Sequence, residues 1–209
     1  SGDVLTEIPA GSAGDVALYA KWGEVQSLSL YVSATGSDST GDGSESSPYL
    51  TLSRAVTHIK ASDDYAAWTV YINGTLAASS LDSSLDEYAY SLTLWGLNYT
   101  SGDGAKDGFY NGDTSSSTLS LTTSLPVTLY GLFVSGGSCG IYISGNGDVS
   151  FEKSGVQGAI NGIYISGHGN VTVDGSSIRS NSGAEYGAGI YKAGSGSLTL
   201  TASSITNNT

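Results

Sequence analysis

The chain has few basic residues, one cysteine, three prolines, no methionine and no long apolar run. Seven basic residues stand against 19 acidic ones, which gives a formal net charge of −12. A negative surface repels phosphates and anionic headgroups, so neither nucleic acid nor a membrane is an expected partner. The single Cys139 excludes an intrachain disulfide. No apolar run reaches the roughly 18 residues of a membrane-spanning helix.

The acidic composition also bears on enzymatic function. It argues against an enzyme for polyanionic sugars such as pectate, unless calcium bridges protein and substrate. Thirty glycines without a collagen period favour a turn-rich β protein over a fibre.

Three similar units occupy the second half of the chain. They read GIYISGNGDVSF from Gly140, GIYISGHGNVTV from Gly162 and GIYKAGSGSLTL from Gly189. One such unit supplies short strands that cannot bury their apolar side alone, so the units are expected to stack as coils with parallel sheets. The residues expected to stack are Ile141, Ile163 and Ile190, and likewise Val149, Val171 and Leu198.

Alternation of apolar and polar residues predicts the strands. They are expected at Thr69–Ile72, Ser91–Trp95, Leu119–Thr122, Val127–Leu129, Ile141–Ile143, Val149–Phe151, Ile163–Ile165, Val171–Val173, Ile190–Lys192 and Leu198–Leu200, and around Val156, Ile178 and Ile205. Glycines are expected at the corners because they tolerate positive φ. Residues 99–118 are expected to form a long loop, and the longer third interval predicts an insertion near Glu185–Gly187.

The phrase YVSATGSDSTGDGSESSPYLTLSRAV contains a strand, a polar loop and the start of an amphipathic helix whose apolar positions include Leu52, Ala55 and Ile59. It closely resembles the opening of bacterial right-handed parallel β-helix proteins, in which a strand, loop and helix cap the first coil. The resemblance implies an all-β fold, a right-handed parallel β-helix solenoid with a short N-terminal capping helix. At about 22 residues per coil we expect roughly eight coils.

The N-terminal segment differs from the rest. Its phrase IPAGSAGDVALYAKW resembles the closing strand of the Listeria–Bacteroides (internalin B-type) extracellular repeat; the alternative is an ordinary leading strand. The expected organisation is therefore the end of a preceding repeat or a leading strand over residues 1–24, a cap over 25–62 and coils over 63–209. The last unit ends at SITNNT without a capping helix, so we expect an open end and a fragment of a longer protein.

His168 is the first residue to consider for catalysis, because it lies in Gly-His-Gly, a motif that is functional in polygalacturonase-type glycosidases of this fold. Glycoside hydrolysis needs two carboxylates. The Asn-Thr-Asp and Arg-Ile-Lys motifs of that family are missing here, and the only Asp-Asp, Asp63–Asp64, lies beside the cap. Asn146 and Ser195 occupy the equivalent position in the neighbouring units, which indicates a variable turn position. We therefore predict no catalytic residue.

Lyase chemistry and calcium binding have weak support. Arg179 is the only arginine of the repeats and has no acidic cluster near it in the sequence. Acidic side chains of two polar segments have oxygens that suit Ca²⁺, although neither has the spacing of an EF-hand loop. These candidates are Asp38, Asp42 and Glu45 near the cap, and Asp103, Asp107 and Asp113 in the long loop. Cys139 is interpreted as a buried or corner thiol.

Tyr142, Tyr164 and Tyr191 recur beside the inward isoleucine of each unit. By strand alternation they point outward and form a ladder. Such a ladder is a candidate binding surface for sugar rings or for a protein partner. The alternative is that the tyrosines only stabilise neighbouring coils, as cross-strand pairs do.

The units resemble polymorphic or adhesin-type β-helix repeats of the form GGIYxxGxGxLTL. The resemblance implies a non-catalytic module of a bacterial surface or secreted protein, with a role as a stalk, in adhesion or in ligand binding. A host protein or glycan is the expected partner, and an extracellular or cell-surface location is expected. The alternative is a carbohydrate-active β-helix enzyme, either a polysaccharide lyase or a glycosidase, or a carbohydrate-binding module.

Overall fold

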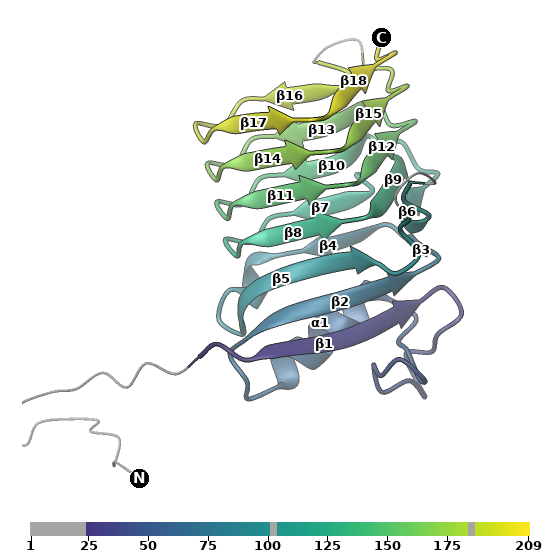
Figure 1. The fold of residues 1–209 in the computed structure, drawn as a ribbon, viewed down its shortest axis with the longest axis vertical. Coiled ribbons are helices and arrows are strands. Elements are labelled where there is room, and N and C mark those ends of the chain that lie inside the picture. Colours follow the sequence, from purple (N-terminus) through teal and green to yellow (C-terminus); the bar gives the residue numbers. More distant parts are fainter. Residues whose placement is uncertain (1–23, 101–103, 184–186) are drawn as a thin grey trace, which may run out of the picture.

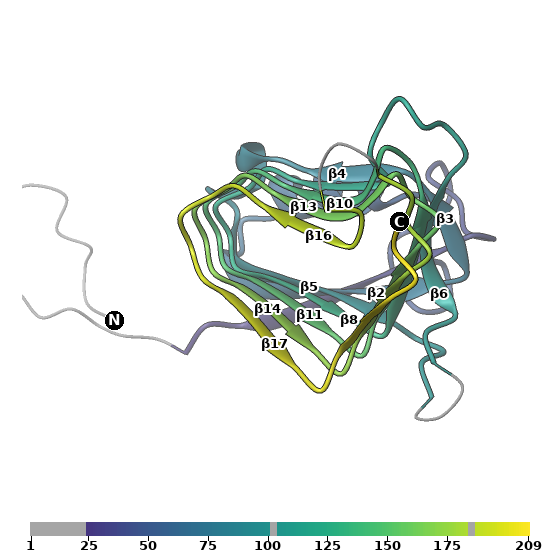
Figure 2. The same ribbon diagram turned by 90° about the horizontal axis from the view of Figure 1, so that it is seen from above.

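The computed structural model describes residues 24–100, 104–183 and 187–209, and in it the chain winds into a stack of coils (Figure 1). Seen from above, successive coils superimpose as one three-sided outline (Figure 2). The strands pair with the equivalent strands of neighbouring coils, and these pairings are parallel. The all-β parallel β-helix with one short helix is therefore confirmed.

Each side of the outline is a parallel sheet. The seven-stranded sheet contains β1 (Ser27–Ser33), β2 (Ala66–Asn73), β5 (Ala89–Gly96), β8 (Val127–Tyr130), β11 (Val149–Glu152), β14 (Val171–Asp174) and β17 (Leu198–Thr201). The six-stranded sheet contains β3 (Thr75–Ala77), β6 (Asp107–Asn111), β9 (Leu132–Gly136), β12 (Gly155–Gln157), β15 (Ser177–Arg179) and β18 (Ser204–Thr206). The five-stranded sheet contains β4 (Ser79–Leu81), β7 (Leu119–Leu121), β10 (Cys139–Ile143), β13 (Asn161–Ile165) and β16 (Ile190–Lys192).

The number of coils is smaller than expected. In the described residues, β2 to β16 make five complete turns of three strands, with β1 at one end and β17 and β18 at the other. The expectation of roughly eight coils came from dividing the length of the chain by a constant number of residues per coil. The cap uses residues 34–65 without adding a coil, and the segment between β5 and β6 is longer than its equivalents in the later coils.

The core follows from the alternation within the strands. In β2 every second side chain is buried, as in a strand with one face on a core. Ile141 lies in register with Ile163, and Ile163 with Ile190, as the repeat predicted. Stacking identical inward residues buries a continuous apolar column, which no single coil could do.

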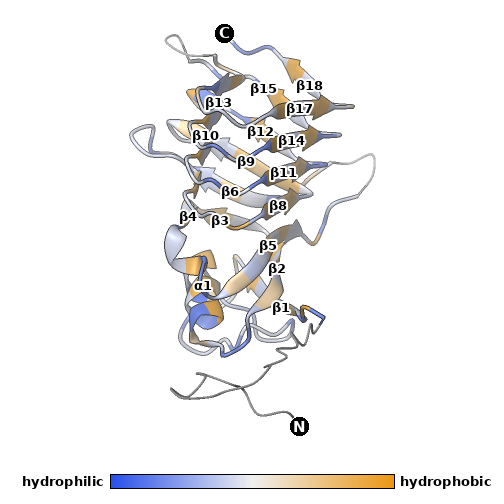
Figure 3. Ribbon diagram, turned by 90° about the vertical axis from the view of Figure 1, so that its left-hand side faces the viewer, coloured by the Kyte–Doolittle hydropathy of each residue, from blue (hydrophilic) through white to orange (hydrophobic). Residues whose placement is uncertain are grey.

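Helix α1 (Leu52–Ala61) covers the N-terminal end of the stack, next to β1 (Figures 1 and 3). It buries the predicted Leu52, Ala55 and Ile59, and the side chain of Thr51 accepts a hydrogen bond from the Arg54 N–H as N-cap. A short 3₁₀ helix, η1 (Ser83–Leu85), lies beside it. The cap therefore closes the apolar end of the first coil.

Buried serines form a polar ladder along one corner of the stack. Ser154 Oγ accepts a hydrogen bond from the Leu132 N–H at 2.9 Å, and Ser176 Oγ accepts one from the Ser154 N–H at 3.1 Å. Each hydroxyl also donates to a backbone carbonyl, so these buried groups are satisfied. The ladder links successive coils at the point where the chain leaves the seven-stranded sheet.

The Gly-x-Gly corners have a different cause from the one expected. Gly145, Gly167 and Gly194 do not have positive φ. A Cβ at Gly167 would instead lie 1.9 Å from the carbonyl oxygen of Gly145, one coil away. Glycine is needed here because the backbones of neighbouring coils approach too closely for a side chain.

The expectations for two loops and for the N-terminal segment have different outcomes. Residues 99–118 do not form one long loop, because they contain β6, whose Phe109 is fully buried. The insertion near Glu185–Gly187 lies mostly outside the described residues, and so does the N-terminal segment 1–23 with its resemblance to an extracellular repeat. Of the described helices, none is long and apolar enough to cross a membrane.

Candidate functional site

A column of aromatic side chains runs up the outer face of the seven-stranded sheet. Its members are Tyr31 on β1, Tyr71 on β2, Trp95 on β5 and Tyr130 on β8, each in register with the next. Ring centroids are 4.9 Å apart for Tyr31 and Tyr71, 6.5 Å for Tyr71 and Trp95, and 4.0 Å for Trp95 and Tyr130. We call this column the front ladder.

Strand alternation places these rings outside. Each follows a buried residue of the core, namely Leu30, Val70, Leu94 and Leu129. The aromatic side chain therefore points away from the core and lies on the pleated surface, where its ring meets the equivalent ring of the neighbouring strand. Trp95 is 38% exposed, and the tyrosines are half-buried by one another.

A column of hydroxyl side chains runs parallel to the front ladder. Ser29, Thr69, Thr93 and Thr128 lie in register on the same face, two residues before each aromatic ring. At about 4.8 Å between strands, the four rungs extend over about 14 Å. A surface with rings in one row and hydroxyls in the next suits a ligand that has apolar ring faces and a hydroxylated edge.

The surroundings of the front ladder differ at its two ends. Beside Tyr31 lies a hollow of about 200 Å³, lined in part by Glu45, Pro48 and Leu97. Burial, the charge of Glu45 and Tyr71 raise the pKa of Tyr31 above its ordinary value. At the other end the column continues as two acidic residues, Glu152 on β11 and Asp174 on β14.

The predicted column Tyr142–Tyr164–Tyr191 is on the five-stranded sheet, and we call it the back ladder. The three residues lie in register on β10, β13 and β16 and are half-buried, as expected for outward positions. Ring centroids are 5.6 Å and 4.9 Å apart, with the rings tilted by 36° and 42°. The ladder geometry agrees with the prediction, whereas its role in binding stays a prediction.

Two of the calcium candidates of residues 99–118, Asp107 and Asp113, are engaged by hydrogen bonds. Asp107 is buried, and its carboxylate accepts hydrogen bonds from the N–H groups of Gly74 and Asn98. Asp113 accepts from the N–H and hydroxyl of Ser115, which lowers its pKa. Asp103 lies outside the described residues.

Near the cap, the carboxylate of Asp38 also accepts hydrogen bonds from backbone N–H groups. Asp38 accepts from the N–H groups of Leu50 and Thr51 and from the Thr51 hydroxyl. Burial alone would raise its pKa, but these hydrogen bonds and nearby Arg54 outweigh burial and lower it. Within the described ranges, no three His, Cys, Asp or Glu side chains gather closely enough to hold a metal ion. Calcium binding therefore stays an untested prediction.

His168 and Cys139 belong to neither of the two aromatic ladders and make local contacts. His168 is exposed, and its Nδ1 lies 2.9 Å from Ser195 Oγ, in the column that Asn146 begins. This is the variable corner position that the repeat predicted. Cys139 is buried, and burial raises the pKa of its thiol, with neighbouring hydrogen bonds opposing the shift only in part.

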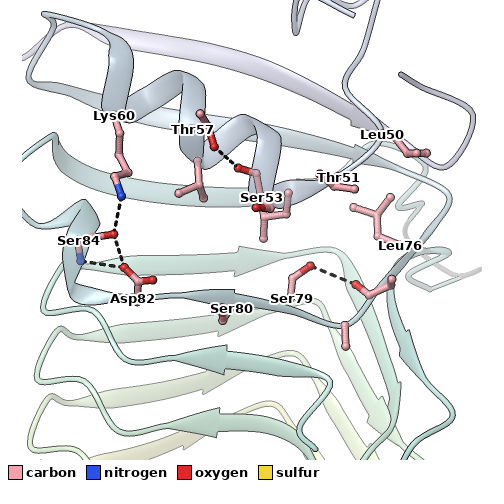
Figure 4. Close-up of a pocket in the computed structure, with 14 residues that line it drawn as sticks. Leu50, Thr51, Ser53, Thr57, Lys60, Leu76, Ser79, Ser80, Asp82 and Ser84 are labelled. Atoms are coloured by element: carbon pink, nitrogen blue, oxygen red, sulfur yellow. Dashed lines mark hydrogen bonds between the residues drawn. The ribbon is translucent and has the colours of Figure 1, made fainter. Parts of the chain in front are cut away.

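A groove of about 470 Å³ lies between α1 and the strands β3 and β4 (Figure 4). Its charged groups are engaged: Lys60 Nζ donates to Ser84 Oγ at 2.9 Å, and Asp82 accepts from the Ser84 N–H. The aromatic ladders contribute nothing to its walls. We therefore place the candidate site at the front ladder, where aromatic side chains are partly exposed on the outer face.

Sequence reasoning missed the front ladder, although a signal was present. The four strands read SLY, TVY, TLW and TLY at Ser29–Tyr31, Thr69–Tyr71, Thr93–Trp95 and Thr128–Tyr130, which is the same pattern of polar, apolar and aromatic residues. The intervals between them are irregular because the cap and the loop before β6 intervene. A search for a constant period could not align them.

These features define the class of protein: a parallel β-helix with an aromatic outer face. Residues 109–209 match the family model for right handed beta helix regions. Among solved structures, the crystal structure of the pectate lyase Pel9A is similar, with a TM-score of 0.61 and 16% identity over 86% of this chain. At that identity the likeness shows the fold alone. The match spans 48% of the Pel9A chain, and no curated protein matches this chain.

Proposed function

We propose that this β-helix is a non-catalytic carbohydrate-binding module, with the front ladder as its binding surface. The single observation that carries the proposal is the in-register column of Tyr31, Tyr71, Trp95 and Tyr130 beside a column of hydroxyls. Aromatic rings that are partly exposed in a row offer an apolar surface against which sugar rings pack, and hydroxyls supply hydrogen bonds to the sugar edge.

The shape of the surface supports binding of an extended ligand. The rings lie on a rigid sheet whose inner face is fully packed, so little conformational entropy is lost when a ligand binds. The strands that carry the ladder stack coil on coil (Figure 1), so its rings form one column. A segment of several sugar units therefore fits better than one isolated monosaccharide.

A glycan array tests the proposal. We expect the wild-type chain to bind a subset of oligosaccharides, and Trp95→Ala/Tyr130→Ala to lose that binding. The matched control is Tyr142→Ala/Tyr164→Ala, which removes two rings from the back ladder and should retain it. Equal loss in both variants, or no binding by the wild-type chain, would contradict the proposal.

One observation favours a second candidate, a carbohydrate-active enzyme. Glu152 and Asp174 lie side by side in register, and Lys153 follows Glu152 directly at the corner. Two carboxylates and a basic group are the parts that sugar cleavage uses. Release of reducing ends from neutral or acidic polysaccharides, with and without calcium, and its loss in Glu152→Gln/Asp174→Asn would favour this candidate over simple binding.

We propose further that the module belongs to a bacterial surface or secreted protein and contacts a host or environmental glycan. The support is the resemblance of its units to adhesin-type repeats, together with their fit to a rigid, stalk-like solenoid. Detection of the native protein in the cell-surface or culture-supernatant fraction of the source organism tests this location. Its recovery only inside cells would contradict the proposal.

A further inference from the structure

A pocket lies at the corner between the seven-stranded and six-stranded sheets. It has a volume of about 250 Å³, and its walls include Tyr99, Phe133, Lys153 and Arg179. Sites for drug-sized molecules measure roughly 300–1,000 Å³, so this one has room for a single small ring rather than a chain. We call it the corner pocket.

The floor of the corner pocket is an aromatic ring beside glycine. Phe133 on β9 is half-buried and points outward, and it lies in register with Gly155 on β12. A Cβ at Gly155 would lie 3.0 Å from Phe133 Cδ2. The ring therefore occupies the space that a side chain on β12 would fill. This arrangement leaves a flat apolar floor.

The walls of the corner pocket are cationic, in a chain with net charge −12. Lys153 and Arg179 are two of the seven basic residues of the sequence. Neither side chain has a hydrogen bond or ion pair within the described ranges. The neighbouring Glu152 accepts a hydrogen bond from Ser150 Oγ at 2.6 Å. Two cations without partners over an aromatic floor suit a ring that has a negative group.

Tyr99 joins the corner pocket to the front ladder. Its ring meets that of Tyr130, the last aromatic rung, with centroids 5.6 Å apart and planes at 75°. It also forms part of the pocket wall. A ligand that lies along the ladder can therefore continue into the pocket without leaving an aromatic surface.

The charges along this path restrict the ligand. The outward columns of the seven-stranded sheet contain no Lys or Arg, and the column of the front ladder continues through Glu152 and Asp174 to Thr201. A polyanion would be repelled there, whereas one negative group in the corner pocket would not. The arrangement thus distinguishes a neutral glycan with an acidic end from an acidic polymer.

We infer that the corner pocket is a subsite for one anionic sugar residue at the end of an otherwise neutral glycan. The inference rests on the proposed carbohydrate binding and adds its charge specificity. The ligand of this subsite is a sugar ring that bears one anionic group, either a carboxylate or a sulfate. Lys153 and Arg179 hold the anion, and Phe133 supports the ring face.

Titration of the ¹⁵N-labelled chain, followed by amide chemical shifts, tests the inference with three probes. Methyl glucuronide has a carboxylate, glucose 6-sulfate has a sulfate, and methyl glucoside is neutral. We expect shifts at Ser154, Gly155 and Ser177 with at least one anionic probe, at an affinity about tenfold or more above that of the glucoside. The response to each anionic probe identifies the source of the charge.

Variants separate specific binding from general charge attraction. Lys153→Gln/Arg179→Gln should lower the affinity for the anionic probe about tenfold or more. Lys60→Gln/Lys192→Gln removes the same charge from α1 and β16 and should leave it unchanged. Equal losses in both variants, or pocket shifts that are the same for the glucoside, would overturn the inference.

The same spectra distinguish the two proposals. Shifts at Tyr71 and Trp95 with all three sugars, without a response at the pocket, would retain the ladder and remove the subsite. Shifts at the pocket with an anionic probe would retain the subsite. An absence of pocket shifts with both anionic probes would contradict the subsite alone, because the ladder is tested with the oligosaccharides of the glycan array.

Discussion

The two aromatic ladders of this β-helix follow the same rule of register but differ in composition and surroundings. The back ladder has three tyrosines from consecutive near-identical units, with tilted rings. The front ladder has a tryptophan among its four rings, two close stacked pairs and a hollow beside Tyr31. The difference indicates that repetition of the sequence accounts for the back ladder. The front ladder brings together aromatic residues from dissimilar segments.

The largest expected effect is on binding through the front ladder. Trp95→Ala should lower the affinity for an oligosaccharide identified on the array about thirtyfold, because truncating a central binding tryptophan costs about 2 kcal/mol. Tyr164→Ala, at the centre of the back ladder, should change it less than about twofold. Isothermal titration calorimetry measures both. A larger loss in Tyr164→Ala would reverse the assignment of the two ladders.

The second prediction extends each ladder by one ring. Glu152→Tyr continues the front ladder beyond Tyr130, and Ser120→Tyr continues the back ladder below Tyr142. An added ring contact of about 0.5–1.5 kcal/mol should raise the affinity about two- to tenfold in the first variant only. The same calorimetric titration checks it. An equal gain from Ser120→Tyr would show that the two faces are equivalent.

The third prediction concerns stability. Tyr164 contacts Tyr142 and Tyr191, so Tyr164→Ser removes two cross-strand pairs and should cost about 1 kcal/mol of unfolding free energy. For a chain of this size the midpoint of thermal unfolding should fall by about 2–4 °C. Differential scanning calorimetry measures the shift, with the exposed Thr199→Ser as control. An unchanged midpoint would contradict a stabilising role for the back ladder.

The smallest expected effect is on the ionisation of Tyr31. Burial, Glu45 and Tyr71 raise its pKa above that of an unfolded tyrosine, which is about 10. The stability linked to its neutral form is therefore complete below pH 10 and is lost as the pH rises through the folded pKa. Phenolate absorbance should show its titration at lower pH in Glu45→Gln. Unchanged titration there would exclude the charge of Glu45 as a cause.

Much of the fold could be predicted because one physical rule generates it. The inward Ile141 and Ile163 repeat at a constant interval, and a solenoid is how short strands with one apolar side bury it. The cap helix was readable from the spacing of Leu52, Ala55 and Ile59. The strands of the later coils followed from the same alternation.

The failures come from places where the repeat is interrupted. β6 was missed because Asp107 and Gly108 suggest a turn, although Asp107 anchors the backbone of Gly74 and Asn98 there. The front ladder was missed because register between distant strands depends on the path of the intervening chain. The glycines of Gly-x-Gly were assigned a turn role, since the distance to the next coil cannot be read from one unit.

A crystal structure of the chain with an oligosaccharide that it binds tests the central claim most directly. The account predicts sugar rings over Trp95 and Tyr130, with hydroxyls hydrogen-bonded to Thr93 and Thr128. Sugar over Tyr142, Tyr164 and Tyr191, or in the groove beneath α1, would contradict it.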